Sequence, residues 1–326
     1  KIIGTGRANP AVVVTNSMLE QFLDTSDEWI RERTGMAERR VISSEKLEDL
    51  AAEASLKAIE DAGLTPADID YIICSNVVNE YATPGLSCIV QGIIGATCAC
   101  IDVNAACSGF IYALDMADDR LKSGKAKNIL VLAAEEPSRM VDWKDRSVCV
   151  LFGDGAGAVV VTEGEGLIGS RLTTVSKTDC LHYFRTLEPT PYITKEEEGK
   201  PMYMNGREVF KTAVLSSSRD IKTLLDAAGL KPEDIKYYVL HQANMRIIEA
   251  ICNHLGLDMS HFPHNVDRYG NTSSASVPIL LDELNREGKL QKGDKLVFSA
   301  FGAGFTTGAC IIEWTKYKSK LIWNIE

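Results

Sequence analysis

Short apolar runs alternate along this chain with segments of helical periodicity, a pattern typical of an α/β protein. The segment Leu47–Asp61 has apolar residues at helical spacing and ends just before Gly63, a residue that commonly stops a helix. The run that follows it, Tyr71–Ser75, predicts a buried strand. The same reasoning predicts further strands at residues 99–103, 128–133 and 158–162, a loop-rich segment at 176–204, and renewed helix–strand alternation from 208.

One cysteine lies between small residues at the junction of a predicted buried strand, 99–103, and a predicted helix. The helix is indicated by a single apolar face made of Phe110, Leu114, Ala117 and Leu121. Cys107 would sit at its start, where unpaired N–H groups and the helix dipole favour a thiolate. The residue is therefore a candidate nucleophile, although a small buried core residue is an equally natural reading of a free cysteine.

The second half of the chain repeats features of the first. Ala62–Tyr71 and Ala228–Tyr237 share seven of ten residues at an offset of 166, and that offset places Cys107 on Ser273. A duplicated α/β unit explains both matches. Two such halves would pack about a pseudo-twofold axis, so Cys107 and the region of Asn271 are predicted to lie close together. The predicted halves are residues 1–170 and 171–326.

Three polar or glycine-rich segments are further candidates for chemistry. His241 follows a predicted strand, where α/β folds place functional groups, and Asn271 lies in a glycine-containing turn before a helix. The segment Ala300–Phe305 is suited to direct N–H groups at an oxyanion. A buried core histidine and an asparagine helix cap are the alternatives. For Gly153–Gly157, close packing between the halves is favoured over nucleotide binding, because the dinucleotide spacing is missing.

Composition narrows the class of protein. The net charge of −10 argues against a general nucleic-acid binder, and no apolar run reaches the length of a membrane span. Nine scattered cysteines indicate a reduced, cytoplasmic location and no disulfide framework. The pair Cys98 and Cys100 lacks a second pair of ligands, so no metal is expected.

Taken together, the motifs resemble those of the β-ketoacyl-[acyl-carrier-protein] synthase III family, within the thiolase-like superfamily. The resemblance covers the chain as far as Trp314 and rests on Asp27–Gly35, Ala105–Gly109, Phe152–Ala158, His241–Asn244, Gly270–Ser276 and Phe301–Phe305. It implies duplicated α/β halves in a five-layer α-β-α-β-α architecture. It also implies a homodimer. No resident cofactor is expected, because acyl-CoA would be a substrate.

The resemblance assigns a role to each candidate. Cys107 would accept an acyl group from acyl-CoA, and His241 with Asn271 would stabilise the enolate formed when malonyl-acyl carrier protein loses carbon dioxide. The N–H groups of Cys107 and Ala303 would form an oxyanion hole. The products would be 3-oxoacyl-acyl carrier protein, CoA and carbon dioxide, in the initiating step of type II fatty acid biosynthesis.

The resemblance also implies binding residues. CoA would contact Thr25, Trp29, Arg33, Arg146, Phe210 and Asn244. The carrier protein would contact Gln242, Ala243, Asn244, Met245 and Arg246. This helix departs from the family pattern at Asn253 and His254, where lysines are common, so Lys211 and Arg207 are expected to assist Arg246. Thr83 and Phe301 would line the acyl pocket, and the small Thr83 predicts primers longer than acetyl.

Two other functions use the same residues. A relative with this fold would prime a polyketide or another secondary pathway and differ only in its acceptor. A Cys-His-Asn thioester hydrolase or papain-like protease is the second alternative, but the residues around Cys107 lack the sequence context of such proteases. Decarboxylation of a malonyl thioester would separate condensation from hydrolysis.

Overall fold

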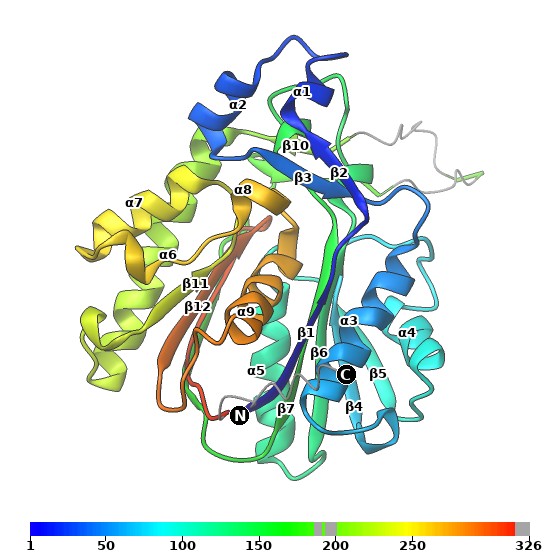
Figure 1. Cartoon of the computed structure of the whole chain (residues 1–326), viewed down its shortest axis with the longest axis vertical. Coiled ribbons are helices and arrows are strands. Elements are labelled where there is room, and N and C mark those ends of the chain that lie inside the picture. Colours follow the sequence, from blue (N-terminus) through cyan, green and yellow to red (C-terminus); the bar gives the residue numbers. More distant parts are fainter. Residues whose placement is uncertain (186–190, 193–200, 317–326) are drawn as a thin grey trace, which may run out of the picture.

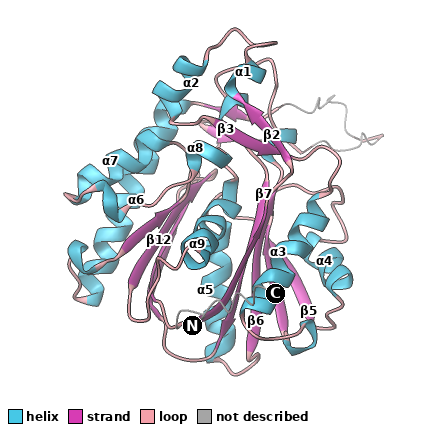
Figure 2. Ribbon diagram, viewed as in Figure 1, coloured by secondary structure: helices cyan, strands magenta, loops and turns pink. Residues whose placement is uncertain are grey.

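Five layers of secondary structure, α-β-α-β-α, make up the molecule (Figures 1 and 2). The computed structural model describes residues 1–185, 191–192 and 201–316. Two β-sheets flank a central pair of helices, and two further helices cover the outer face of each sheet. This arrangement confirms the predicted fold class.

The first sheet has five strands in the order β1-β7-β6-β4-β5. Strands β4, β5 and β6 run parallel to one another, whereas β7 is antiparallel to both β6 and β1. Along β6, Ile129, Val131 and Ala133 face the central helices, and the residues between them face the outer helices. A strand covered on both faces needs such a continuous apolar run. The strands are β1 (Ile2–Ala8), β4 (Tyr71–Ser75), β5 (Ala99–Val103), β6 (Asn128–Glu135) and β7 (Gly155–Thr162).

The second sheet has four strands in the order β11-β12-β13-β8. Strands β11 and β12 are parallel, and β13 is antiparallel to both of its neighbours. The sheet therefore repeats the mixed topology of the first sheet with one strand fewer. The strands are β8 (Leu167–Thr174), β11 (Tyr237–Leu240), β12 (Lys295–Gly302) and β13 (Thr306–Glu313).

Helices α5 and α9 lie between the sheets, where their apolar residues share one core with both sheets. Helices α3 and α4 cover the outer face of the first sheet, and α6 and α7 that of the second. The layer helices are α3 (Leu47–Asp61), α4 (Leu86–Ile94), α5 (Gly109–Lys122), α6 (Gly206–Ala228), α7 (Met245–Leu255) and α9 (Ser276–Arg286). In the part that the structure describes, no helix combines the length and apolar character needed to cross a membrane.

Smaller elements gather at one end of the layers, above the carboxyl ends of the parallel strands (Figure 1). Strands β2 and β3 pair with each other, as do β9 and β10. The last two belong to the segment predicted as loop-rich, part of which lies outside the described residues. The smaller elements are β2 (Val12–Thr15), β3 (Glu38–Val41), β9 (Leu181–His182), β10 (Tyr203–Met204), α1 (Asn16–Leu19), α2 (Asp27–Thr34) and α8 (Val266–Tyr269).

Most of the predicted elements are confirmed, but the burial of one strand is not. The helix Leu47–Asp61 and the strand Tyr71–Ser75 have the predicted bounds. The prediction that residues 99–103 form a buried strand is wrong on burial, because β5 is the edge of its sheet and Ala99 and Ile101 are exposed. The division at residue 170 stays a prediction; it falls within β8, which pairs with β13 of the second sheet.

Candidate active site

Cys107 lies on a tight turn between β5 and α5. Ala106 just before it has a φ of 49°, in the left-handed region that non-glycine residues rarely adopt. The Ser108 hydroxyl donates to the Ala105 carbonyl at 2.7 Å and closes the turn. A Cβ atom on Gly109 would lie 2.1 Å from the Ser75 Oγ atom. Gly109 is therefore required by close packing at this turn.

A second tight turn, at Asn271–Ser273, enters the site from the other half of the molecule. The Asn271 N–H donates to the Leu151 carbonyl at 2.8 Å, and the Asn271 carbonyl accepts from the Gly153 N–H at 3.1 Å. A Cβ atom on Gly153 would lie 2.2 Å from the Tyr269 carbonyl oxygen. The glycines at 153–157 thus allow the halves to approach closely, as predicted.

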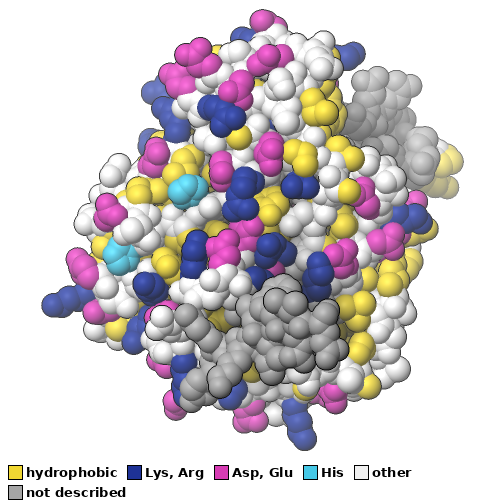
Figure 3. All heavy atoms as spheres, viewed as in Figure 1, with side chains coloured by type: hydrophobic (Ala, Val, Ile, Leu, Met, Phe, Trp, Pro, Cys, Tyr) yellow, Lys and Arg dark blue, Asp and Glu magenta, His cyan; other side chains and the backbone are white. Residues whose placement is uncertain are grey.

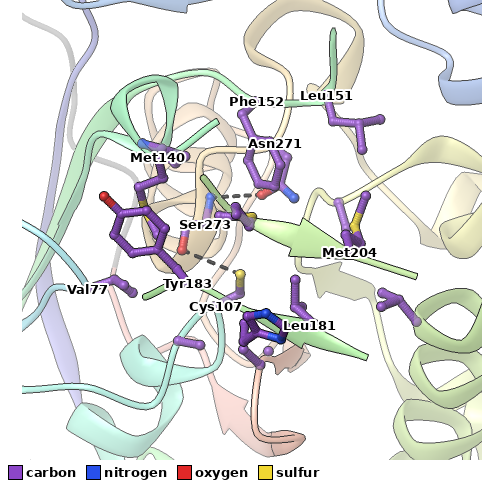
Figure 4. Close-up of a pocket in the computed structure, with 18 of the residues that line it drawn as sticks. Val77, Cys107, Met140, Leu151, Phe152, Leu181, Tyr183, Met204, Asn271 and Ser273 are labelled. Carbon is purple, nitrogen blue, oxygen red and sulfur yellow. Dashed lines mark hydrogen bonds between the residues drawn. The ribbon is translucent and has the colours of Figure 1, made fainter. Parts of the chain in front are cut away.

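The two turns meet in the middle of the molecule. The Ser273 Oγ atom lies 3.4 Å from the Cys107 Sγ atom, and the Asn271 side-chain oxygen accepts from the Ser273 N–H at 2.9 Å (Figure 4). Ser273 also has a left-handed φ of 53°, a backbone strain that is characteristic of functional sites. The prediction from the repeat, that Cys107 and the Asn271 region are close in space, is confirmed.

His241 follows the last residue of β11 and is buried beside the same cavity. Its Nδ1 atom lies 2.7 Å from the Ser276 Oγ atom, and its ring packs edge-on against Phe301 with the centroids 5.3 Å apart. Burial lowers the pKa of His241 to about 3, so the imidazole is neutral. The Ser276 hydroxyl accepts the Gln242 N–H, and its own proton is free for Nδ1. We therefore assign the His241 proton to Nε2.

Burial also governs the pKa of two acidic groups at the site. It raises the pKa of the Cys107 thiol to about 12, against the hydrogen bond from Ser273. This opposes the effect expected of the helix start, so the turn alone does not yield a thiolate at neutral pH. The Glu135 carboxyl is 1% exposed, and burial raises its pKa to about 7.

A cavity of about 1100 Å³ connects Cys107, His241 and Asn271 to the surface. Figure 4 shows Leu181, Tyr183 and Met204 around the same cavity as Asn271 and Ser273. Within the described part of the chain, neither the Cys107 N–H nor the Ala303 N–H donates to a main-chain carbonyl, which leaves both for a ligand in the cavity. The predicted site residues along its wall are Trp29, Arg33, Cys107, Phe210, His241, Ala243, Asn244, Asn271, Phe301 and Ala303.

An aromatic ring with two guanidinium groups stands at the mouth of the cavity. The Arg33 and Arg146 guanidinium carbons lie 4.7 Å and 5.2 Å from the centroid of the half-buried Trp29 ring. Arg146 also forms an ion pair and a main-chain hydrogen bond with Asp24. Thr25 lies near this cluster in sequence but not on the cavity wall; its hydroxyl is buried without a partner among the described residues.

The start of α7 divides into a buried and an exposed part. Asn244 caps the helix by accepting the Arg246 N–H at 2.9 Å, and its amide donates to the Arg33 carbonyl. Met245 is half-buried and Arg246 is exposed. Gln242, by contrast, is 1% exposed and bonds to main-chain atoms of Leu240 and Asn265. Its burial speaks against the predicted contact between Gln242 and a carrier protein.

Thr83 is a predicted pocket residue that lies away from the cavity of this chain. It is exposed and does not line the cavity, although its neighbours Tyr81 and Ala82 do. Its predicted contact is with a partner subunit, so the single chain leaves that prediction open. Among the described residues, no three His, Cys, Asp or Glu side chains are placed to hold a metal ion.

Sequence reasoning missed two residues of the site. The sequence did point to Ser273, because the repeat offset pairs it with Cys107. That pairing alone did not assign it a role. Glu135 is the last residue of β6, at the carboxyl end of a parallel strand where functional side chains gather. The predicted strand ended at residue 133, which left Glu135 outside it.

Known proteins resemble this chain along nearly its whole length. Residues 101–179 match the family described as 3-Oxoacyl-[acyl-carrier-protein (ACP)] synthase III, and residues 225–314 match the C-terminal part of the same enzyme. A curated relative from Clostridium acetobutylicum, Beta-ketoacyl-[acyl-carrier-protein] synthase III, is 46% identical, with 97% of this chain and 99% of the relative covered.

Solved structures agree with the sequence matches. 3-oxoacyl-[acyl-carrier-protein] synthase III from Aquifex aeolicus superposes with a TM-score of 0.90 at 43% identity, covering 96% of this chain and 99% of the other. The priming β-ketosynthase of the R1128 polyketide pathway superposes with a TM-score of 0.91 at 34% identity, covering 97% and 96%. The chain therefore belongs to the β-ketoacyl-[acyl-carrier-protein] synthase III family, the condensing acyltransferases that initiate fatty acid synthesis.

Proposed function

We propose that this enzyme transfers an acyl group from acyl-CoA to the Cys107 thiol and condenses it with malonyl-acyl carrier protein. The observation that carries the proposal is the convergence of Cys107, His241 and Asn271 on one cavity from both halves of the fold. A thiolate accepts and releases an acyl group in two steps that are each easier than direct transfer. The oxyanion formed in each step would be held by the N–H groups of Cys107 and Ala303.

The second step, decarboxylation and condensation, requires hydrogen-bond donors that do not act as bases. Decarboxylation leaves negative charge on the thioester oxygen of the malonyl unit, and the neutral His241 Nε2–H and the Asn271 amide would stabilise it. The low pKa of His241 keeps the ring uncharged at neutral pH. A water molecule at the acyl-Cys107 bond then finds no strong base on His241, which favours condensation over the alternative of hydrolysis.

Coenzyme A would enter past Trp29. The adenine ring stacks on an aromatic face, and Arg33 and Arg146 supply charge for its phosphates. Because both guanidinium groups lie near the Trp29 ring, binding of the nucleotide would displace at least one of them. The exposed ring of Phe210 and the amide of Asn244 continue the wall inward toward Cys107, along the path proposed for pantetheine.

The acidic carrier protein would dock beside this entrance. Arg207 and Lys211 on α6 and Arg246 on α7 are exposed, and none of the three forms an ion pair with another described residue. Basic and acidic side chains are intermixed on the face that Figure 3 shows. We propose that carrier recognition relies on the three exposed cations Arg207, Lys211 and Arg246.

A homodimer would complete the acyl pocket. The exposed edge strand β5 offers unpaired main-chain groups, and Ile101 on β5 and Ile93 on α4 are 40% and 49% exposed. An open, apolar strand edge is normally covered. Pairing of β5 with its counterpart in a second subunit would cover both residues and bring Thr83 near the partner's cavity.

Mass spectrometry after incubation with acyl-CoA tests the proposed function. We expect an acyl adduct on the peptide that contains Cys107 and its disappearance when malonyl-acyl carrier protein is added, with release of carbon dioxide. Absence of the adduct, or an equal adduct in a Cys107→Ser variant, would count against the mechanism. The secondary-pathway alternative predicts a preference for another acceptor, whereas the curated relatives favour the fatty acid role.

A further inference from the structure

One buried carboxyl group at the site has no part in the mechanism described so far. The Glu135 side chain accepts the Val77 N–H at 3.1 Å, the Ser274 hydroxyl at 2.6 Å and the Ser273 hydroxyl at 3.2 Å. A second serine, Ser75, bonds to Ser274 at 2.9 Å. Burial of a carboxyl group is costly unless it is hydrogen-bonded. The three hydrogen bonds to Glu135 offset that cost and hold its side chain in place.

The hydrogen bonds form a continuous chain from Glu135 to the nucleophile. The Ser273 Oγ atom lies 3.2 Å from Glu135 Oε1 and 3.4 Å from Cys107 Sγ. A hydroxyl group has one proton and donates one hydrogen bond. Either the Cys107 thiol donates to Ser273 and Ser273 to Glu135, or a protonated Glu135 donates to Ser273 and Ser273 to a Cys107 thiolate.

These two arrangements differ only in the positions of two protons. The enzyme needs both arrangements during its reaction. The first is the resting thiol, and the second is the nucleophile. No hydrogen bond joins His241 to Cys107 among the described residues, and the His241 Nδ1 atom is occupied by Ser276. Ser273 is therefore the one described side chain placed to take the proton from the Cys107 sulfur.

We propose that Ser273 and Glu135 form a proton relay that activates Cys107. The thiol proton moves to the Ser273 Oγ atom while the Ser273 proton moves to Glu135 Oε1, so that the negative charge passes from the carboxylate to the sulfur. Ser273 touches the reacting atom, and Glu135 acts through it. This inference rests on the proposed function, in which Cys107 is the nucleophile.

The relay balances over a full turnover. The Cys107 thiolate attacks the acyl-CoA carbonyl and CoA leaves as a thiolate, which takes a proton from solvent. Glu135 keeps its proton, and is neutral, while the malonyl carboxylate leaves as carbon dioxide and the enolate forms. Attack of the enolate on the acyl-Cys107 carbonyl releases the Cys107 thiolate. The proton then returns from Glu135 through Ser273 and restores the thiol.

A neutral Glu135 during condensation also has an electrostatic reason. A carboxylate in this buried region would repel the enolate, whereas its protonated form does not. The pKa of Glu135, about 7, permits both states near neutral pH. Among the described residues, the thiols of Cys74 on β4 and of Cys107 interact electrostatically with Glu135, and burial keeps both protonated.

The test compares Glu135→Gln with a matched control, Glu136→Gln. Glu136 is the next residue, is half-buried and pairs with Arg139 at 3.6 Å outside this chain of hydrogen bonds. The measurement is the rate of acyl adduct formation on Cys107 from acyl-CoA between pH 5.5 and 9, followed by mass spectrometry. Alkylation of the same peptide by iodoacetamide gives a second readout that does not involve acyl-CoA.

In the wild-type protein we expect the rate to fall as the pH drops through about 7, because Glu135 then becomes protonated and cannot accept a proton. In Glu135→Gln that inflection should vanish and the rate at pH 7.5 should fall on the order of 100-fold, a typical contribution of acid–base catalysis. Glu136→Gln should keep the inflection. Glu135→Asp, which retains a carboxyl group, should restore part of the rate.

An inflection near pH 7 that persists in Glu135→Gln, with a rate within threefold of wild type, would overturn the relay. Should that variant fail to fold, Ser273→Ala leaves Glu135 in place and removes the link to Cys107; it must show the same loss. Ser274→Ala removes a bond to Glu135 but no contact with the sulfur, and a loss equal to that of Ser273→Ala would also contradict the relay. A wild-type protein without any adduct would instead refute the proposed function.

Discussion

The side chains of Cys107 and Ser273 meet at 3.4 Å, and the two residues are 166 positions apart, which is the offset of the internal repeat. Equivalent positions of the two halves therefore face each other across the pseudo-twofold axis. In the first half this position carries the proposed nucleophile, Cys107. In the second half it carries the Ser273 hydroxyl group, which hydrogen-bonds to the Cys107 sulfur. The offset of the internal repeat thus relates the two partners of a single hydrogen bond.

Replacement of His241 by Ala should separate the two half-reactions. We expect condensation to fall on the order of 100-fold or more, because a donor to the enolate is lost. Adduct formation on Cys107 should change by less than about fivefold, since His241 does not bond to the sulfur. Acylation is measured by mass spectrometry and decarboxylation by release of labelled carbon dioxide. Asn271→Ala should act in the same direction, and an equal loss in both half-reactions would contradict the assignment.

Replacement of Trp29 by Ala should weaken binding of acyl-CoA and leave the chemistry unchanged. Aromatic contacts contribute about 0.5–1.5 kcal/mol, so the KM for acyl-CoA should rise about 2- to 13-fold at similar kcat. Acyl-pantetheine, which lacks the nucleotide, is the matched control substrate. Its KM should not respond to the substitution, and an equal rise for both substrates would place Trp29 elsewhere on the path.

Replacement of Gly109 by Ala should destabilise the protein through the turn that holds Cys107. The added Cβ atom would lie 2.1 Å from the Ser75 Oγ atom, and overpacking of this kind costs about 1–3 kcal/mol. The measurement is the free energy of unfolding in urea. Gly206→Ala, at the first residue of α6, is the control because its Cβ atom meets nothing within 4 Å. That variant should be as stable as wild type or slightly more so, by about 0.4–1 kcal/mol.

The sequence predicted most strands and helices because local pattern and burial agree along most of the chain, whereas the five-layer arrangement was implied by the family resemblance. Strand β6 is apolar and buried from Ile129 to Ala134, and helix α3 has one apolar face. The exposure of β5 could not be predicted, because the apolar residues of this edge strand do not distinguish it from a strand that is covered on both sides. The burial of Glu135 and Gln242 could not be predicted either. These polar side chains are buried because they hydrogen-bond to segments distant in sequence, which no local pattern reveals.

The small side chain of Thr83 predicts that the enzyme accepts primers longer than acetyl. Initial rates with acetyl-CoA, isobutyryl-CoA and hexanoyl-CoA measure this preference directly. A Thr83→Phe variant should lose activity with hexanoyl-CoA about tenfold more than with acetyl-CoA, because the larger ring would shorten the partner's pocket. A wild-type enzyme that strictly prefers acetyl-CoA would contradict the prediction.

The edge strand β5 gives the sharpest test of the proposed homodimer. Ile101 on β5 and Ile168 on β8 are 40% and 41% exposed, and each lies on the edge strand of its sheet. Only the β5 edge is proposed to pair with a second subunit. Ile101→Asp would place a charge in that interface, and burial of an unpaired charge is unfavourable. We expect sedimentation velocity to show a dimer for the wild type and for Ile168→Asp, and a monomer for Ile101→Asp. A monomeric wild type, or a dimer that Ile101→Asp leaves intact, would rule out this interface.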